Sequence, residues 1–449
     1  MKNQYFICLI LTTMLLFQGC KKGFLDEKPN VKLVIPTTLE DFRVLLDNSG
    51  IMNRIPALPI ICSDDFFTSD DGYQALVLDM ERNAYTWKRE IYGGDPILDW
   101  STLFTAILYA NIVLEGLEKI DPNPAQQSQW DELKGTALFF RALAYSNLID
   151  TFSPPYNSAT SSTDLGMPLH LAANVNDRPK RASVEETYQQ IITDLTAAEP
   201  LLPVVVSYKT RPSKAAAAGL LARIYQTMGN YEKAALYADQ AVVLHNKPLI
   251  NFSTLDKNSN SPFPSVLPNG NDEIIFYTNP VSYQFPANSL TEVVKPLYNS
   301  YAPNDLRKAL FFRLRPNGLI TYKGYKSGIL IDEMYLISAE SNARLGKVTE
   351  SMGKLNALLK TRFDATYVPF TAQTPDEALS IVIVERRKEL LGKHLRWRDL
   401  RRLNQEPQFA VTISRTVLGK VYELPPNDPR YTLKIPDDEI LSSGMAQNP

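Results

Sequence analysis

The segment KAAAAGLLARIYQTMGNYEKAALYADQAVV, residues 214–243, decides the fold that the sequence predicts. Its first half places apolar residues three or four positions apart, which is the spacing of one face of an α-helix. Gly229-Asn230 then interrupts the pattern as a turn. Three alanines restore the spacing in the second half: Ala234, Ala238 and Ala241. Because small alanines let two helices approach closely, the segment predicts a helix pair of the tetratricopeptide type.

Comparable helix pairs are predicted on both sides of this segment. Residues 100–117 and 130–148 carry apolar side chains at helical spacing on either side of a turn-like stretch. Residues 334–359 resemble a second alanine-rich unit. Trp100 begins one of these apolar stripes, so we expect it to be a core residue. The predicted helical repeats cover about 100–152, 183–244 and 332–402.

The residues between the second and third repeats have a different composition. Residues 246–330 are rich in Pro, Asn, Gly and Tyr, and residues 318–330 suggest a short β-hairpin. A long irregular insertion in a helical scaffold is more often a functional surface than a filler. The predicted fold is therefore mostly α, a tetratricopeptide-like helix-pair scaffold with an irregular, loop-rich insertion and short β-hairpins.

The N-terminus has the features of an export signal. Lys2 precedes an apolar run over residues 5–17, which is too short to span a membrane, and Gly19 stands directly before Cys20. This arrangement predicts a signal peptide at 1–19 and acylation of Cys20, and a plain signal peptide with an incidental cysteine is the alternative. We expect a lipidated tether at 20–36, a single domain at 37–449, and membrane contact through the lipid anchor alone.

Charge and cysteine content limit the classes of function. A net charge of −2 without a concentrated basic run argues against nucleic-acid binding. Once Cys8 leaves with the signal and Cys20 carries lipid, Cys62 is the remaining thiol. One thiol makes no internal disulfide, so we expect Cys62 to be a small buried side chain in a fold held by its core.

Motifs for catalysis and metal binding are missing from the sequence. It contains no G-x-S-x-G, Walker loop, H-E-x-x-H or paired C-x-x-C, and its three histidines, His170, His245 and His394, stand in different segments. We therefore predict neither a metal site nor a cofactor, and we expect the histidines at the surface or in the core. The acidic stretch with Asp64 and Asp70 could supply calcium ligands or glycosidase carboxylates, but a solvated loop is the favoured interpretation.

The charged run at residues 386–404 is interpreted as structural. Acidic residues interleave with its arginines and its leucines require burial, so it predicts an ion-pair network on a packed helix that also buries Trp397. The preceding run at 379–384 is β-branched and would suit a buried strand by itself. Its flanks favour helix, so we predict helix there.

Six blocks in order along the chain resemble the SusD/RagB family of surface nutrient-binding lipoproteins of Bacteroidetes. The opening block is Phe24-Leu25-Asp26 with Pro29, followed by four blocks within the helical repeats and the charged run. These are 100–117, 132–149, 181–203 with 219–231, and the pairs Glu385-Arg386, Glu389-Leu390, Arg396-Trp397 and Asp399-Leu400. The last block is 435–449. Lys393-His394 departs from the family, which usually has Glu-Gly there, and we expect the change to affect a local turn and its ion pairing.

The resemblance implies a non-catalytic lipoprotein at the outer membrane, facing the cell exterior. It implies capture of oligosaccharide, or peptide in some members, and delivery to a SusC-like TonB-dependent barrel. Two other classes stay open from the residues alone. One is a helical glycan-active hydrolase that uses carboxylates such as Asp64 or Asp70, and the other is a helical-repeat scaffold that binds protein partners only.

A glycan site needs exposed aromatic rings flanked by polar groups. The repeats use their aromatic residues for packing, which leaves residues 64–87 and the insertion, and we expect these two regions to meet at one face. The predicted ligand-binding residues are Asp70, Tyr73, Trp87, Tyr277, Tyr283, Tyr322 and Tyr325, with Tyr298 as a further ring of the insertion. Tyr73, Tyr283 and Tyr325 are the preferred contacts. The alternative is that several of these rings pack the loops themselves.

Overall fold

The structure, a computed structural model, describes residues 36–265, 270–324 and 327–448. The chain divides into two units, Met1–Thr37 and Thr38–Pro449. The predictions for the signal peptide and Cys20 lie outside the described residues, as does all of the tether except residue 36.

The second unit is mostly helical, which confirms the predicted fold class. Its α-helices are α2 (Leu39–Leu46), α3 (Ser49–Met52), α4 (Leu58–Cys62), α5 (Asp70–Gln74), α6 (Asp79–Tyr85), α7 (Leu98–Leu117), α8 (Gln127–Phe152), α9 (Val184–Ala198), α10 (Lys214–Thr227), α11 (Tyr231–His245), α12 (Gln284–Ala287), α13 (Lys295–Asn299), α14 (Arg307–Phe311), α15 (Ile331–Arg344), α16 (Val348–Leu359), α17 (Pro375–Glu389), α18 (Arg396–Leu403) and α19 (Asp437–Ser443).

The strands are short and scattered among the helices. They are β1 (Arg54–Ile55), β2 (Phe66–Thr68), β3 (Leu165–Pro168), β4 (Arg181–Ser183), β5 (Ile274–Pro280), β6 (Thr291–Val293), β7 (Phe312–Leu314), β8 (Ile320–Tyr322), β9 (Ser327–Leu330), β10 (Ile413–Val417) and β11 (Lys420–Leu424).

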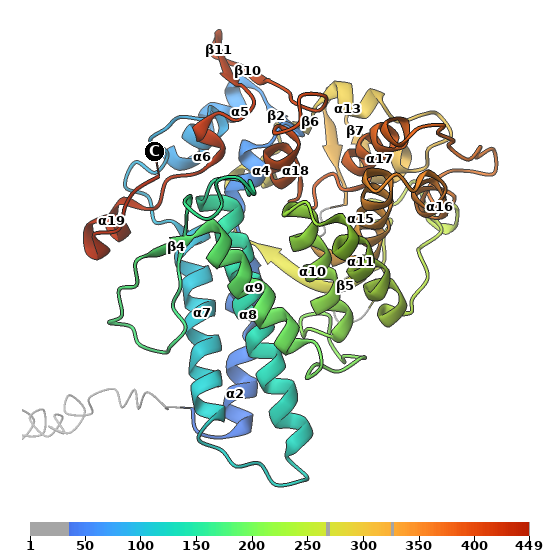
Figure 1. Cartoon of the computed structure of the whole chain (residues 1–449). Coiled ribbons are helices and arrows are strands. Elements are labelled where there is room, and N and C mark those ends of the chain that lie inside the picture. The colour runs from blue at the N-terminus through green and yellow to red at the C-terminus, as the bar shows by residue number, and fades with distance from the viewer. Residues whose placement is uncertain (1–35, 266–269, 325–326, 449) are drawn as a thin grey trace, which may run out of the picture. The chain divides into compact units, whose positions relative to one another are not determined.

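The long helices pack as consecutive neighbours, as the repeat pattern predicts. The helix α7 lies against α8, α8 against α9 and α10 against α11, and α11 in turn contacts α15 (Figure 1). Within the second pair, Gly229 takes a left-handed φ of 74° and Asn230 caps α11 through the backbone N–H of Lys233. The turn expected at Gly229-Asn230 is therefore confirmed, and it reverses the chain so that the alanine faces meet.

Two helices have sequences that also suit another kind of structure. By length and composition α7 could cross a membrane, but it packs against α2 and α8 and is a core helix of this unit. The β-branched run at 379–384 lies inside α17, as predicted, because Thr374 caps the helix and Pro375 occupies its first turn. Val382 is buried on the inner face, whereas Val384 points outward.

The predicted β-hairpin at residues 318–330 is wrong. The strand β8 pairs with β7 across the Gly318 turn, whereas β9 pairs with β5, which also pairs with β1 in a three-stranded sheet. All four residues of β9 are buried, and β5 is a largely buried strand. The buried strands therefore pair with each other, and Gly328 permits it, since a Cβ there would lie 2.0 Å from the carbonyl oxygen of Phe276.

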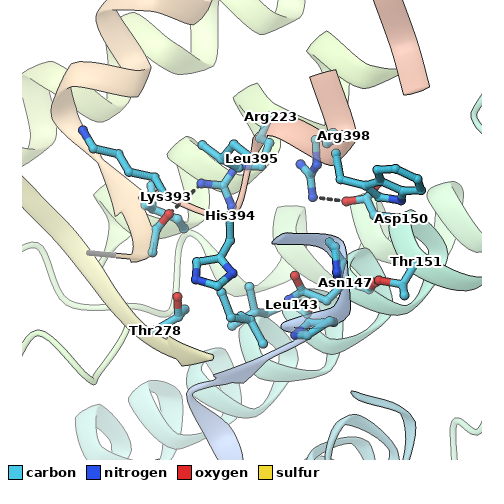
Figure 2. A pocket seen from close by; sticks show the side chains of 16 residues that line it. Leu143, Asn147, Asp150, Thr151, Arg223, Thr278, Lys393, His394, Leu395 and Arg398 are labelled. Atoms are coloured by element: carbon cyan, nitrogen blue, oxygen red, sulfur yellow. Dashed lines mark hydrogen bonds and ion pairs between the residues drawn. The ribbon is translucent and has the colours of Figure 1, made fainter. Parts of the chain in front are cut away.

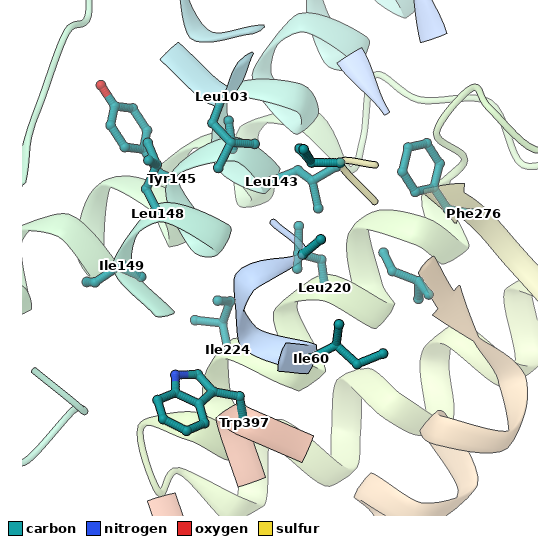
Figure 3. Close-up of a cluster of buried hydrophobic side chains, with 14 of the residues drawn as sticks. Ile60, Leu103, Leu143, Tyr145, Leu148, Ile149, Leu220, Ile224, Phe276 and Trp397 are labelled. Atoms are coloured by element: carbon teal, nitrogen blue, oxygen red, sulfur yellow. The ribbon is translucent and has the colours of Figure 1, made fainter. Parts of the chain in front are cut away.

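The core joins segments that are distant in the sequence. Figure 3 shows side chains from α4, α7, α8, α10, β5 and α18 converging on one cluster that includes Trp397. Trp100 and Trp397 are 3% and 2% exposed, which confirms that both are core residues. Cys62 is also buried as expected, and burial raises the pKa of its thiol to about 12, so it stays protonated.

The charged run forms the predicted ion-pair network, and it extends beyond its own helices. Arg386 on α17 pairs with Asp399 on α18 at 2.9 Å. Arg307 on α14 pairs with Glu385 at 2.5 Å and with Glu389 at 3.1 Å, and its side chain is fully buried. The network therefore ties the C-terminal helices to the insertion.

The interpretation of the acidic stretch as a solvated loop is wrong at its first two carboxylates. Asp64 pairs with Arg396 at 2.7 Å and with Arg387 at 3.0 Å, and Arg387 also pairs with Asp65 at 3.0 Å. Burial alone would raise the pKa of Asp64, but Arg396 and Arg387 hold that pKa well below its usual range. These carboxylates anchor α18 to the N-terminal part of the unit.

Candidate ligand-binding site

The two regions expected to form the ligand face do meet. The strand β2 pairs antiparallel with β6 from the insertion. Glu81 on α6 accepts hydrogen bonds from the backbone N–H groups of Gln284 and Phe285, at 3.1 and 2.6 Å, and so caps the start of α12. The amide of Gln284 donates in return to the carbonyl oxygen of Ala75 at 3.0 Å. These contacts hold the segment after β5 against α5 and α6.

A cavity of about 490 Å³ opens beside this junction. Its walls are the end of β5, the segment that leads into α12, and one residue of the α17–α18 loop. The lining residues are Ala57, Tyr277, Asn279, Pro280, Val281, Ser282, Tyr283, Pro286, Ala287, Ser327 and His394. They combine two phenol rings with amide and hydroxyl groups, which is the mixture that recognises a sugar.

Tyr277 lies on β5 and its ring is half-buried. Its backbone is held on both sides, because its N–H donates to Lys209 at 2.8 Å and its carbonyl accepts from the side chain of Asn53 at 2.9 Å. Burial raises the pKa of its phenol, so the group stays neutral and can donate a hydrogen bond. Tyr277 therefore has a fixed backbone and a half-buried ring that borders the cavity.

Tyr283 is more deeply set, with 8% of its surface exposed. Its hydroxyl donates to the buried carboxylate of Asp99, which also accepts from the backbone N–H groups of Ala57 and Leu58, at 2.7 and 2.9 Å. Burial, followed by the charge of Asp99, raises the pKa of Tyr283. The ring of Tyr283 is therefore held rigidly at the cavity wall, and its hydroxyl is hydrogen-bonded within the protein.

His394 closes the cavity on the side of the α17–α18 loop. It also borders a smaller inner cavity of about 40 Å³, and Figure 2 shows its ring among the side chains that line it. Its backbone φ is 61°, in the left-handed region that favours glycine. Its Nδ1 is buried and has no hydrogen-bond partner among the described residues.

The structure brings two of the seven predicted ligand residues, Tyr277 and Tyr283, into this cavity. Asp70 and Tyr73 lie on α5 in the adjoining region but do not line it. The carboxylate of Asp70 accepts from the N–H of Leu418 at 2.7 Å and supports the β10–β11 turn, and the ring of Tyr73 packs 6.0 Å from that of Tyr85. Tyr325 lies outside the described residues.

The expectation of exposed rings is wrong for Trp87 and Tyr322, and also for Tyr283, which is buried although it lines the cavity. Trp87 is 3% exposed, and its indole N–H donates to the carbonyl of Cys62 at 2.8 Å. Tyr322 is 8% exposed and packs 5.7 Å from the ring of Phe311. Tyr298, the further ring of the insertion, lies edge-on to Phe312 at 5.2 Å. These rings pack the loops, because the insertion must bury its own aromatic surface to be ordered.

Sequence reasoning missed the polar members of the cavity, Asn279, Ser282 and Ser327, and assigned His394 to the surface or core. The available signal for His394 was the departure from the usual Glu-Gly pair at 393–394. No comparable signal marks the others, because an asparagine or serine in a loop has no distinctive spacing. In the described part of the chain, no group of three or more His, Cys, Asp or Glu side chains could hold a metal ion.

Comparison with known families agrees with this architecture. Residues 23–226 match a SusD-like family model described as "Starch-binding associating with outer membrane", and residues 331–449 match the model of the SusD family. The chain belongs to the SusD/RagB family. Proteins of this family bind glycans and associate with the outer membrane.

Individual relatives are distant. The SusD-like protein P2 of Formosa agariphila is 29% identical over 137 residues, which is 30% of this chain and 25% of that protein. A solved structure from Bacteroides vulgatus has a TM-score of 0.76 at 21% identity, with coverage of 92% of this chain and 99% of that chain. For the surface glycan-binding protein A of Bacteroides uniformis the TM-score is 0.69 at 16% identity, with coverage of 92% and 99%. At these identities the solved structures show a shared fold.

Proposed function

We propose that this SusD-family protein binds an oligosaccharide in the cavity beside β5 and delivers it to a SusC-like TonB-dependent barrel. The observation that carries the proposal is that two phenol rings, Tyr277 and the rigidly held Tyr283, line one cavity. They do so together with the amide of Asn279 and the hydroxyl of Ser282. Rings cover the C–H faces of a sugar, and amides and hydroxyls satisfy its hydroxyl groups. Membership of a glycan-binding family supports the same conclusion.

We propose binding without cleavage. The carboxylates that favoured a hydrolase are engaged elsewhere, Asp64 with Arg387 and Arg396, and Asp70 with the N–H of Leu418. A retaining or inverting glycosidase needs two carboxyl groups that flank the scissile bond. The described lining of the cavity contains no carboxyl group.

The proposed location is the outer face of the outer membrane, with Cys20 acylated after removal of residues 1–19 and residues 20–36 as the tether. One acyl chain gives only marginal membrane binding, so the proposal includes multiple acylation at Cys20. A Cys20→Ala variant should leave the membrane fraction. Mass spectrometry of the wild-type N-terminus checks the modification, and a mature chain that begins at another residue contradicts it.

Isothermal titration tests the binding function. The detergent-solubilised lipoprotein is titrated with maltoheptaose, laminariheptaose, cellohexaose and a mixture of peptides, and we expect saturable binding of an oligosaccharide. Reducing-end release is measured in parallel and should not rise above that of the buffer. Phe104→Ala provides a matched control, because Phe104 lines a separate cavity of about 300 Å³ beside α7. Binding of peptides alone, or of neither class, contradicts the proposal.

A further inference from the structure

His394 occupies a backbone position that a histidine rarely takes. It stands in the loop between α17 and α18 with a φ of 61°, where a Cβ crowds the backbone and glycine is the usual residue. Strained positions persist when the surrounding structure holds them, and they concentrate at sites of function. The side chain is not buried for packing alone, because it borders both the outer and the inner cavity.

The two ring nitrogens of His394 differ in surroundings. Nδ1 is buried and lacks a hydrogen-bond partner among the described residues. Nε2 is not among the described nitrogens that are both buried and unpartnered, so we assign it to the ligand contact. Burial lowers the pKa of His394 to about 4, so at neutral pH the ring is uncharged and offers one donor and one acceptor.

The described walls of the outer cavity carry no charged side chain. The charges nearest to His394 around the inner cavity are occupied by partners: Lys393 pairs with Asp332, and Arg398 pairs with Asp150. Arg223 likewise binds Glu333 at 2.5 Å.

The guanidinium of Arg54 adjoins the outer cavity without lining it, because it donates to the carbonyl oxygens of Gly50 and Pro280 at 3.2 and 2.8 Å. An anionic glycan would lose its hydration in this cavity without pairing directly with a cation of the lining, which disfavours it.

We propose that His394 contacts the bound glycan and selects neutral over anionic oligosaccharides, through hydrogen bonds between its imidazole and a sugar hydroxyl. The proposal rests on the oligosaccharide-binding function above and specifies its ligand class. A neutral imidazole pairs with a hydroxyl group as donor and acceptor at once, whereas a carboxylate or sulfate would favour a cation at this position. The strained backbone is retained because glycine would leave the sugar without this partner.

The test compares wild type with His394→Gly, His394→Asn and His394→Lys, using maltoheptaose and laminariheptaose as neutral probes and heptagalacturonate as the anionic probe. We expect wild type to bind at least one neutral probe at least tenfold more tightly than heptagalacturonate. His394→Gly should lose about tenfold in affinity for that neutral probe. His394→Asn, which tolerates positive φ and keeps a donor and an acceptor, should stay within about threefold of wild type. His394→Lys should shift the preference toward heptagalacturonate.

Asn246→Gly is the matched control for the backbone effect. Asn246 ends α11 with a φ of 48° and does not line the cavity, so this variant should bind as wild type does. If His394→Gly does not fold, His394→Asn and the wild-type comparison of neutral and anionic probes decide the proposal. Unchanged affinity in His394→Gly, or equal wild-type affinity for heptagalacturonate, overturns this inference alone. Failure of wild type to bind any oligosaccharide overturns the proposed function, and this inference with it.

Discussion

Lys393 and His394 are neighbours in the chain but belong to opposite kinds of surroundings. The ammonium of Lys393 pairs with the buried carboxylate of Asp332 in a network that also contains Glu389 and Arg362. His394 faces a cavity whose described walls are uncharged. Lys393 thus belongs to a charged network, whereas His394 stands between the charged lining of the inner cavity and the uncharged lining of the outer one.

The difference shows how this fold separates the residues that stabilise it from the residues proposed to contact ligand. A buried charge is costly unless several partners surround it, so each charged group of the network constrains the elements that carry its partners. Arg362, for example, bonds Glu389 from α17 and Glu273, which immediately precedes β5, both at 2.8 Å. Such constraints hold β9 and the α17–α18 loop in place. The cavity wall is then free to consist of neutral groups suited to a neutral ligand.

The largest expected effect comes from breaking the network. Arg307→Met removes the partner of Asp305, Glu385 and Glu389 and leaves three buried carboxylates with less compensation. We expect it to lower the free energy of unfolding by about 3–5 kcal/mol. Chemical denaturation measures this change. Arg387→Met is the control: the Arg387 side chain is 30% exposed, so its loss should lower the free energy of unfolding less. Equal stability of Arg307→Met and wild type would show that the network is dispensable.

Replacement of a core tryptophan tests whether ion pairs alone stabilise α18. Trp397 stands beside Arg396 and Arg398, is 2% exposed, and packs 4.8 Å from Tyr431. Trp397→Ala should cost about 3–5 kcal/mol of unfolding free energy through the cavity it creates. Trp130→Ala, at a half-buried ring, should cost less. If Trp397→Ala denatures almost as wild type does but no longer binds glycan, Trp397 is a ligand-binding residue and not a core residue.

Acid should weaken the ion-pair network of the scaffold. Burial alone would raise the pKa of Glu389, but Arg362, Lys393 and Arg307 lower it to about 2, and Arg386 and Arg402 lower that of Asp399 to about 2. The stability from these depressed pKa values is present above pH ~4 and is lost as the pH falls toward 2. Each group should contribute on the order of 2 kcal/mol to the decline. Unfolding midpoints measured from pH 7 to pH 2.5 check this, and a flat profile contradicts it.

The smallest effect on stability, and a specific effect on binding, is expected at the cavity wall. Tyr277→Ala should weaken binding of the neutral heptasaccharide by roughly 1–2 kcal/mol, about a five- to thirtyfold loss. Because the ring is half-buried and the backbone of Tyr277 carries the strand bonds, the melting temperature should change little. Titration calorimetry and thermal melting are read together. Full affinity in Tyr277→Ala would place the ligand outside this cavity.

The candidate site was predictable in its location more than in its members. The two aromatic-rich regions could be identified because they lack helical spacing, and they do meet. Tyr277 and Trp87 were both predicted as ligand-binding residues, yet one borders the cavity and the other donates to the carbonyl of Cys62 from within the core. Burial of a ring depends on the segments that cover it, and these come from elsewhere in the chain.

The sequence by itself determined the helical scaffold, because helix spacing, turn residues and caps act over a few neighbouring positions. The alanine-rich pair at 214–243 and the helix across 379–384 are examples. Only the tertiary structure decided which groups are partners over long separations: Asp64 with Arg396, 332 positions later in the chain, and β9 with β5 rather than with β8. It also placed His394 between two cavities. These outcomes arise because all segments of the chain compete for burial, and because each buried charge needs a partner of opposite sign. A local sequence pattern carries no information about either.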